Sequence, residues 1–389
     1  MKLKYNINTI LTYNNDVKKS PYTSGIEAII LGNKCLCICN FSQVFIFNKI
    51  YQLIQTINLS TLYYFPKNMI PIINYPNLFA LHEDKSVHIY EIQLKKKKEK
   101  VKLKNVINIP KKYKDKIFYI FSLSCANILF FFQDEFLIYH IKENAFTYKK
   151  ISIPSEKKYE LLRHQKYIIK IIEYKKNELI ILLRDIIYEK ENEDYECEFH
   201  MRNLIVLYDI EKSELKKVYM NTEESAGTYN SYLGNYDFEL NDASVSKSPN
   251  IFLINNSIVY IKDNQKEWGD NMHYDKYDHI YYSIYIINIL TGDIKYEFED
   301  NGIESKYFGF NEFYYSFQKS IHLCDNIFLF NGYEITVTKN GVKQNKIDII
   351  YGTNEDDYKN NQHYFLKMKK DVFLMYNSHE IKICFFTKK

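Results

Sequence analysis

The chain of 389 residues repeats one short pattern along most of its length, and this repeat limits the possible folds more than any other feature. In each copy a polar residue opens an apolar run, a tight polar turn follows, and a second apolar run returns. β-branched and aromatic residues suit a pleated, half-buried surface, whereas Asn, Asp, Ser and Gly form turns, so each copy predicts a hairpin. Five compact copies span 34–47, 76–90, 126–139, 326–337 and 371–384, and two longer copies span 177–210 and 250–290.

These copies predict the blades of a β-propeller. Their spacing of roughly 40 to 70 residues begins at the usual blade length, and most copies have a further strand on either side. The last copy lacks a fourth strand because only Thr387, Lys388 and Lys389 follow its final run, whereas segment 2–11 is a strand without a blade. Pairing the two closes the ring and leaves no large exposed edge.

We therefore expect an all-β chain in which residues 1–389 form one domain, a seven-bladed β-propeller of four-stranded blades. The N-terminal strand would close it by pairing with the C-terminal blade. Two separate β-sandwiches are the alternative fold. Segment 158–174 is the best candidate for a helix, although its second half is equally typical of a strand.

Two hairpins carry a family resemblance. The segments LIVLYDIEKSELKKVY (204–219) and IYIINILTGDIKYEF (284–298) resemble the third and fourth strands of a WD40-type blade, where an apolar strand ends in a turn such as Thr-Gly-Asp or Glu-Lys-Ser. No Gly-His opens a blade, and the single tryptophan, Trp268, is followed by Gly269 rather than Asp. The Asp–His–Ser–Trp hydrogen-bond set of typical WD40 blades therefore cannot be assigned to any residue. The resemblance implies a degenerate WD40-like propeller.

Three acidic insertions interrupt the repeat at 189–201, 221–248 and 263–280. The first lies between strands two and three of blade four, the second joins blades four and five, and the third lies between strands two and three of blade five. Since neighbouring strands alternate in direction, we expect all three on one sector of one face. Their net charges are −5, −4 and −3, so a chain of net charge +4 carries +16 elsewhere.

Aromatic residues accompany these acidic segments and are candidates for binding a protein partner. Aromatic side chains anchor interfaces, and carboxylates would steer a basic segment of the partner. The alternative is that the insertions are polar loops that bind nothing. The candidates are Tyr195, Tyr229, Tyr232, Tyr236, Trp268, Tyr274 and Tyr277.

A lysine-rich segment, 95–104, is expected as a loop on the opposite face, between strands three and four of blade two. Its residues Lys95, Lys96, Lys97 and Lys98 are candidates for contact with an anionic membrane or RNA. Only three of the 52 basic residues are arginine, so such contacts would have little bidentate specificity. A solvated loop, or a guard against edge-to-edge strand pairing, is the alternative.

Motifs for catalysis are missing from the sequence. It contains no G-x-S-x-G elbow, P-loop, dinucleotide glycine fingerprint or H-E-x-x-H. Cys197 and His200 supply half of a zinc site at most. We therefore assign no catalytic residue, metal, cofactor or small-molecule substrate.

The sequence favours a non-enzymatic interaction scaffold, a subunit or adaptor of a larger assembly. A propeller enzyme with its site at the central channel mouth is the alternative. No run approaches the roughly 18 apolar residues of a membrane span, and polar residues interrupt the N-terminal apolar runs. The odd number of cysteines does not suggest a complete disulfide framework. We expect an intracellular protein, cytoplasmic or nuclear, without a signal peptide.

Overall fold

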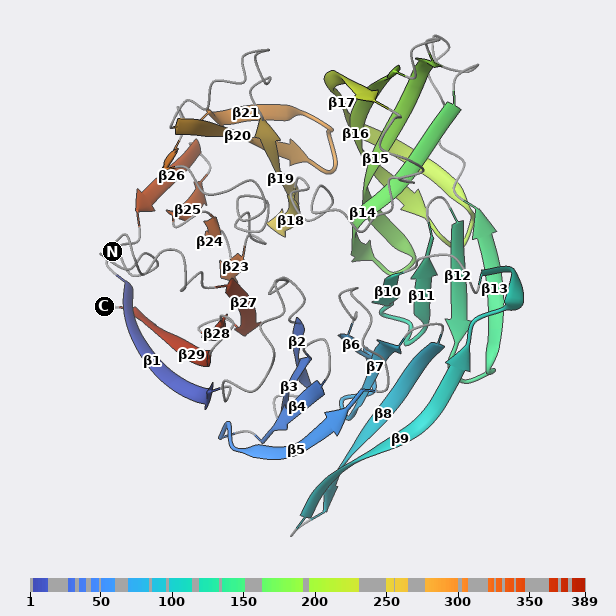
Figure 1. Cartoon of the computed structure of the whole chain (residues 1–389), viewed down its shortest axis with the longest axis vertical. Helices are drawn as coiled ribbons and strands as arrows, with labels where there is room; N and C mark the ends of the chain where they lie inside the picture. Colours follow the sequence, from blue (N-terminus) through green and yellow to red (C-terminus); the bar gives the residue numbers. More distant parts are fainter. Residues whose placement is uncertain are drawn as a thin grey trace. The chain divides into compact units, whose positions relative to one another are not determined.

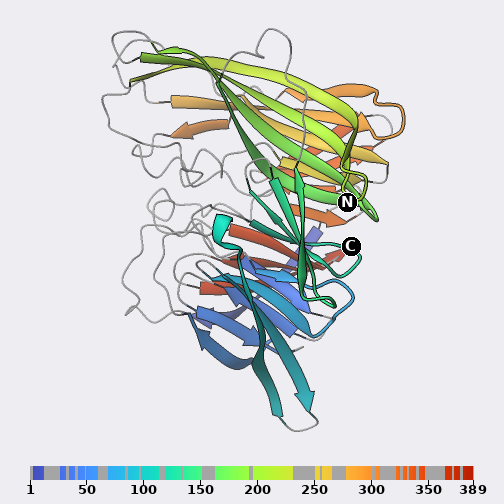
Figure 2. The same ribbon diagram turned by 90° about the vertical axis from the view of Figure 1, so that its right-hand side faces the viewer.

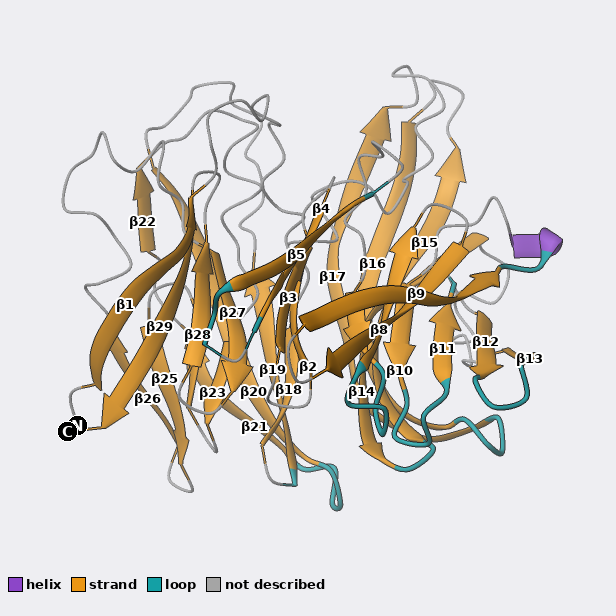
Figure 3. Cartoon of the chain, turned by 90° about the horizontal axis from the view of Figure 1, so that it is seen from below, coloured by secondary structure: helices purple, strands orange, loops and turns teal. Residues whose placement is uncertain are grey.

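A computed structural model gives the fold as a series of antiparallel β-sheets. It describes residues 3–12, 27–31, 35–39, 43–48, 50–59, 69–83, 86–95, 98–113, 119–132, 135–150, 163–191, 196–230, 250–254, 256–264, 277–299, 303–306, 321–324, 327–330, 333–338, 341–346, 364–369, 372–376 and 380–388. The chain divides into two compact units, Met1–Asp115 with Gly309–Lys389 (unit 1) and Lys116–Phe308 (unit 2). Within the described residues, Figure 3 shows strands throughout and one short 3-10 helix, η2 (Lys111–Tyr113).

Unit 1 contains four sheets of four strands each (Figure 1). The first sheet comprises β2 (Glu27–Leu31), β3 (Cys35–Cys39), β4 (Gln43–Phe47) and β5 (Leu53–Asn58). The second comprises β6 (Met69–Pro71), β7 (Leu78–Glu83), β8 (Ser86–Lys95) and β9 (Lys98–Asn108). The third comprises β23 (Ile321–Cys324), β24 (Ile327–Phe330), β25 (Tyr333–Thr338) and β26 (Gly341–Lys346). In each of these sheets the strands lie in chain order, so each is a meander.

The fourth sheet of unit 1 joins the two ends of the chain. Its order is β1 (Leu3–Thr12), β29 (Glu380–Lys388), β28 (Val372–Tyr376) and β27 (Tyr364–Lys369). β1 runs antiparallel to β29, with Tyr5 opposite Phe386 and Thr12 opposite Glu380. The pairing of the N-terminal strand with the last two-strand copy, expected from the sequence, is confirmed.

Unit 2 contains three sheets, shown from the side in Figure 2. The first comprises β10 (Tyr119–Ser122), β11 (Ile128–Phe131), β12 (Glu135–His140) and β13 (Ala145–Lys150). The second comprises β14 (Arg163–Lys175), β15 (Glu178–Glu191), β16 (Glu196–Asp209) and β17 (Glu214–Asn230). The third comprises β18 (Asn250–Ile254), β19 (Ser257–Asn264), β20 (Tyr277–Asn288) and β21 (Ile294–Glu299), and β22 (Ile303–Lys306) pairs with the first part of β20. Because β14 is a strand from Arg163 onward, the helical alternative for 158–174 is wrong over that part.

The core of unit 2 explains why the repeat reads as short unbroken apolar runs. On β15, Leu179, Ile181 and Leu183 pack with side chains of the β10–β13 sheet, whereas Ile180 and Leu182 pack with side chains of the β18–β21 sheet. Successive residues of a strand point to opposite faces, so a sheet covered on both faces needs apolar residues at every position. Each fully buried Leu or Ile contributes roughly 1.5–3 kcal/mol.

The turns between the third and fourth strands repeat one arrangement in three sheets. A polar side chain at the end of the third strand accepts two backbone N–H groups: Asn48 from Ile50 and Gln52, Asp209 from Glu211 and Lys212, Asn288 from Leu290 and Thr291. Each turn also holds one residue with positive φ, which lets the chain reverse direction: Tyr51, Ser213 and Gly292. The two WD40-like hairpins, 204–219 and 284–298, thus contain the third and fourth strands of their sheets, as the resemblance implies.

Candidate interaction surfaces

The acidic insertions of unit 2 are shorter as loops than the sequence predicts, because strands extend into them. β15 continues to Glu191 and β16 begins at Glu196, and Glu191 lies opposite Cys197. β17 continues to Asn230, opposite Glu196. Acidic residues have low intrinsic strand preference, but each strand here has a paired neighbour that satisfies its backbone groups. The neighbour therefore overrides the local preference, and only 192–195 separates β15 from β16.

Where the structure describes them, the three insertions consist of strand ends that lie away from the turns at 210–213 and 289–293. At the opposite end, the Tyr219 hydroxyl donates to the backbone oxygen of Ile289 at 2.9 Å, and Lys217 Nζ donates to Leu290 O at 3.3 Å. The start of β17 therefore lies beside the end of β20. Burial raises the pKa of Tyr219, so its hydroxyl is a firm donor in this contact. Strand alternation predicts this placement of the described strand ends, and the placement of the insertions as a whole stays a prediction.

Two of the seven aromatic candidates lie in strands that the structure describes, and their positions are given by the strand register. Tyr229 lies near the end of β17, opposite Cys197, and Tyr277 is the first residue of β20, opposite Lys306 of β22. Both positions are at the end of unit 2 that carries the insertions. The other five candidates lie outside the described residues: Tyr195, Tyr232, Tyr236, Trp268 and Tyr274. Partner binding by these aromatics stays a prediction.

A buried ion pair spans the middle of this sheet and was not predicted. Arg202 of β16 donates from Nε at 2.8 Å and from Nη2 at 2.6 Å to Asp185 Oδ2 of β15. Their side chains are 2% and 0% exposed. The two residues face each other directly in the strand register, on the face that also carries Leu183 and Leu204. The pair therefore lies at the border between the apolar core and the extended part of the strands.

The neighbouring residues on the opposite face of the same strands form a second polar contact. Arg184 Nε donates to Asn203 Oδ1 at 3.2 Å, and Asn203 Nδ2 donates to the Tyr260 hydroxyl of β19 at 3.3 Å. Asn203 and Tyr260 are 1% and 0% exposed. Together with the Arg202–Asp185 pair, these contacts form a polar layer across β15, β16 and β19.

The positions of the few arginines are the sequence signal that points to this layer. All three arginines of the chain lie in one sheet, on β14, β15 and β16: Arg163, Arg184 and Arg202. Lysine serves at the other 49 basic positions. Arginine suits buried pairs because its planar fork donates several hydrogen bonds in a fixed geometry. Two of these rare arginines, Arg184 and Arg202, mark the polar layer, although Arg184 contacts Asn203 and not its chain neighbour Asp185.

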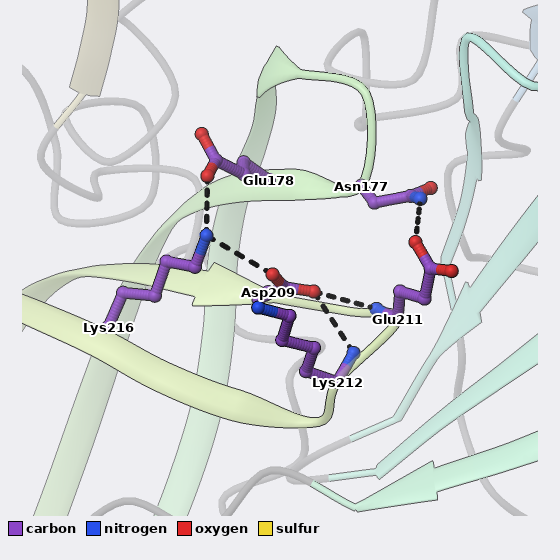
Figure 4. Close-up of polar contacts among 6 residues, drawn as sticks. All are labelled: Asn177, Glu178, Asp209, Glu211, Lys212 and Lys216. Carbon is purple, nitrogen blue, oxygen red and sulfur yellow. Dashed lines mark hydrogen bonds and ion pairs between the residues drawn. The ribbon is translucent and has the colours of Figure 1, made fainter.

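The turn end of unit 2 carries a partly exposed polar cluster around the buried Asp209, drawn in Figure 4. Lys216 Nζ lies 2.6 Å from Glu178 Oε1 and 3.1 Å from Asp209 Oδ2. Backbone N–H donation from Lys212, followed by hydrogen bonding to Lys216, lowers the pKa of Asp209. Hydrogen bonds to Glu178 and Asp209 raise the pKa of Lys216. The Asn177 amide donates to Glu211 Oε2 at 2.6 Å, so the cluster links two hairpin turns of the sheet.

The lysine-rich segment of unit 1 forms a hairpin, not the loop that the sequence predicts. β8 runs to Lys95 and β9 begins at Lys98, which lies opposite Lys95. Lys96 and Lys97 lie outside the described residues. Backbone pairing extends both strands despite the lysines, for the same reason as in the acidic segments.

The described part of β9 is an exposed basic strand at the edge of its sheet. Lys100, Lys102 and Lys104 are exposed, and Lys104 Nζ lies 3.2 Å from Glu91 Oε1. Hydrogen bonds from Gln93 and Lys104 lower the pKa of Glu91. From the neighbouring sheet, β5 lies against β9. Its Gln55 Oε1 accepts the backbone N–H of Val101 at 3.0 Å.

Two further features bear on the class of site. Among the described residues, no group of three or more His, Cys, Asp or Glu side chains is placed to hold a metal ion. In that same part of the chain, no helix has both the length and the apolar character needed to cross a bilayer.

Comparisons with known proteins place the chain in a broad fold class. No protein-family model and no curated protein matches the sequence. The WD40 domain of Neurospora crassa Pan2 is similar in structure, with a TM-score of 0.50 and 9% identity over 98% of this chain and 96% of that chain. Kuenenia stuttgartiensis hydrazine synthase has a TM-score of 0.49 and 8% identity over 95% and 98% of the two chains. The likeness to the Pan2 domain, with the repeated four-stranded sheets, indicates an all-β fold of the β-propeller type.

Proposed function

We propose that the chain is a seven-bladed, WD40-like β-propeller that acts as a non-enzymatic scaffold for protein–protein interaction, as a subunit or adaptor of a larger assembly. The seven sheets would be its blades in one domain, and the shared sheet of β1 and β29 supports closure of the ring. The likeness to a WD40 domain supports the fold part of the proposal.

The observation that carries the functional part is the extended end of the β14–β17 sheet. Its strands continue past the polar layer into the acidic segments, at the end of unit 2 where the β19–β20 insertion also begins. Paired strands that carry acidic and aromatic residues suit a partner with a basic segment. Aromatic anchors would supply contact area and the carboxylates would speed the encounter.

A lysine-rich peptide tests this proposal on the full chain. Calorimetry should detect binding that weakens as the salt concentration rises, since exposed charges are screened. Replacing Glu193→Gln and Asp194→Asn should weaken binding, and Trp268→Ala should weaken it further if aromatics anchor the peptide.

A matched control removes the same charge elsewhere. Glu143→Gln with Glu214→Gln alters two exposed carboxylates at other hairpin ends of unit 2 and should leave the affinity unchanged. Equal losses in both double variants would show that net charge alone attracts the peptide, and the proposed surface would then be wrong.

A second candidate function rests on the exposed lysines of β9. Lys100, Lys102 and Lys104 continue the basic hairpin whose tip is 95–98, and together they could hold an anionic membrane or RNA. Replacing Lys95, Lys96, Lys97 and Lys98 by Gln should abolish binding to anionic vesicles or RNA. Unchanged binding would remove this candidate.

A further inference from the structure

A chain of hydrogen bonds joins a serine, a histidine and a glutamate in the β7–β8 hairpin of unit 1. Ser86 Oγ lies 3.1 Å from His88 Nε2, and His88 Nδ1 lies 3.1 Å from Glu83 Oε1. The Tyr90 hydroxyl donates to the same carboxylate oxygen at 3.1 Å. This cluster belongs to neither of the two surfaces described above.

The hairpin geometry explains the alignment. Glu83 ends β7 and lies opposite Ser86, which begins β8. Ser86, His88 and Tyr90 alternate along β8, so their side chains lie on one face of the strand. The Tyr90 ring stacks on Phe79 with centroids 5.2 Å apart, which holds the phenol over the carboxylate.

The hydrogen bonds determine which nitrogen of His88 can accept a proton. The carboxylate of Glu83 is an acceptor, so Nδ1 must carry a hydrogen and donate it. Nε2 of the neutral ring is then an acceptor, facing the Ser86 hydroxyl. The Ser86 hydroxyl also donates to the backbone oxygen of Glu83 at 3.1 Å. Its single hydrogen is therefore shared between that oxygen and Nε2, and it must turn toward Nε2 before the proton can move.

In a second imidazole–hydroxyl pair of the protein, the hydrogen bond runs in the opposite direction. The Asn127 amide Nδ2 lies 3.1 Å from His140 Nδ1, and His140 Nε2 lies 2.9 Å from Thr147 Oγ1. An amide NH₂ can only donate, so Nδ1 of His140 is the acceptor and Nε2 carries the hydrogen. His140 therefore donates to Thr147 and cannot take its proton.

The cluster is accessible from solvent at its reactive end. The His88 side chain is 20% exposed and Ser86 is half-buried, whereas the Glu83 side chain is 6% exposed. A buried carboxylate, an oriented imidazole and a reachable hydroxyl form the arrangement by which a general base activates a serine nucleophile.

We propose that Ser86 is a reactive nucleophile that accepts an acyl or phosphonyl group from a small activated ester or phosphonate, with His88 as its base and Glu83 as the positioning residue. Ser86 Oγ forms a bond to the carbonyl carbon or phosphorus, and its proton moves to His88 Nε2. The bond to the leaving group breaks, and the leaving group departs with the electron pair. The adduct requires no turnover, so this reactivity is independent of the scaffold function.

A biotin-linked fluorophosphonate tests the proposal on the full chain. Oxygen attack at phosphorus releases fluoride, and peptide mass spectrometry should locate the phosphonyl group on Ser86 of the unaltered protein. Ser86→Ala should remove this adduct. His88→Gln should lower the limiting rate of labelling by about 100-fold or more, as expected for loss of a general base, and leave the half-saturating probe concentration unchanged.

Two matched variants separate activation from simple exposure of a hydroxyl. Ser124 Oγ donates to Glu173 Oε1 at 2.8 Å, and no imidazole nitrogen is its partner in that contact. Ser124→Ala and Thr147→Ala should therefore label like the unaltered protein. Glu83→Gln should lower the limiting rate, and Glu83→Asp should restore part of it.

Absence of an adduct on Ser86, in a mixture where a known serine hydrolase is labelled, would overturn the proposal. An adduct that forms as fast in the folded His88→Gln protein as in the unaltered protein would also overturn the proposal. In either case the hydrogen bonds of the cluster would only stabilise the β7–β8 hairpin.

Discussion

Removing one partner of the Arg202–Asp185 pair is the most severe single test of the polar layer. Both side chains are almost fully buried, at 2% and 0% exposed, and two hydrogen bonds from Arg202 end on one carboxylate oxygen. Asp185→Ala removes the carboxylate that faces a buried guanidinium, and breaking such a buried pair costs about 3–5 kcal/mol. For a unit of about 190 residues, this free energy lowers the thermal midpoint by about 6–20 °C.

Circular dichroism during heating measures this change, and a double variant checks its cause. Asp185→Leu with Arg202→Met removes both charges and replaces them with apolar groups of similar size. Because no buried charge is then left alone, the double variant should unfold at a higher temperature than either single variant. As a control, Lys104→Met breaks only the exposed contact with Glu91 and should leave the midpoint nearly unchanged.

Two results would refute this account of the polar layer. The first is a midpoint for Asp185→Ala within a degree of the unaltered protein. The second is a double variant whose loss of stability relative to the unaltered protein equals the sum of the losses of the two single variants, since that would mean the two charges act independently.

The turn end of unit 2 gives three further predictions. Asp209→Asn should keep both turn hydrogen bonds, since Asn288 makes the same contacts in its own sheet, whereas Asp209→Ala should lose about 1–2 kcal/mol in urea unfolding. Gly292→Ala should cost about 1–2 kcal/mol because φ is +85° there, and Lys217 Nζ would lie 2.7 Å from the added Cβ. The pKa of Asp209 is lowered, so its ion pair with Lys216 should stabilise the fold at neutral pH and lose this effect as the pH falls below about 4. The stability difference between Asp209→Asn and the unaltered protein should therefore shrink in acid and persist up to about pH 10, since the pKa of Lys216 is raised.

The repeat in the sequence predicted the strands well because apolar side chains decide which strands are buried. The unbroken run at 179–183 is apolar on both faces, and both faces of β15 are covered. The pairing of β1 with β29 followed from a missing strand at one end and a surplus strand at the other. Such arguments depend on local pattern and on the need to pair backbone groups, and both are visible in one sequence.

The ends of strands were predicted less well, for a physical reason. Segments such as 196–201 and 98–104 carry charges that disfavour strands in isolation, yet each lies beside a long partner strand. Pairing with that partner satisfies the backbone whatever the side chain, so the strand ends where the partner ends. Neighbour effects of this kind are not visible in local composition.

The hydrogen-bonded sets of side chains were missed because they follow from register. Glu83 and Ser86 face each other only because β7 and β8 meet in a tight hairpin, and Asp185 meets Arg202 only because β15 and β16 pair in one register. A shift of one residue in that second pairing would move Asp185 off Arg202 and send the apolar side chains of β15 to the wrong faces. The apolar pattern therefore selects the register, and the register brings the two charges together. The buried pair in turn penalises any slip of the strands that carry the acidic segments, so the same contacts that stabilise unit 2 also fix the register of its extended end.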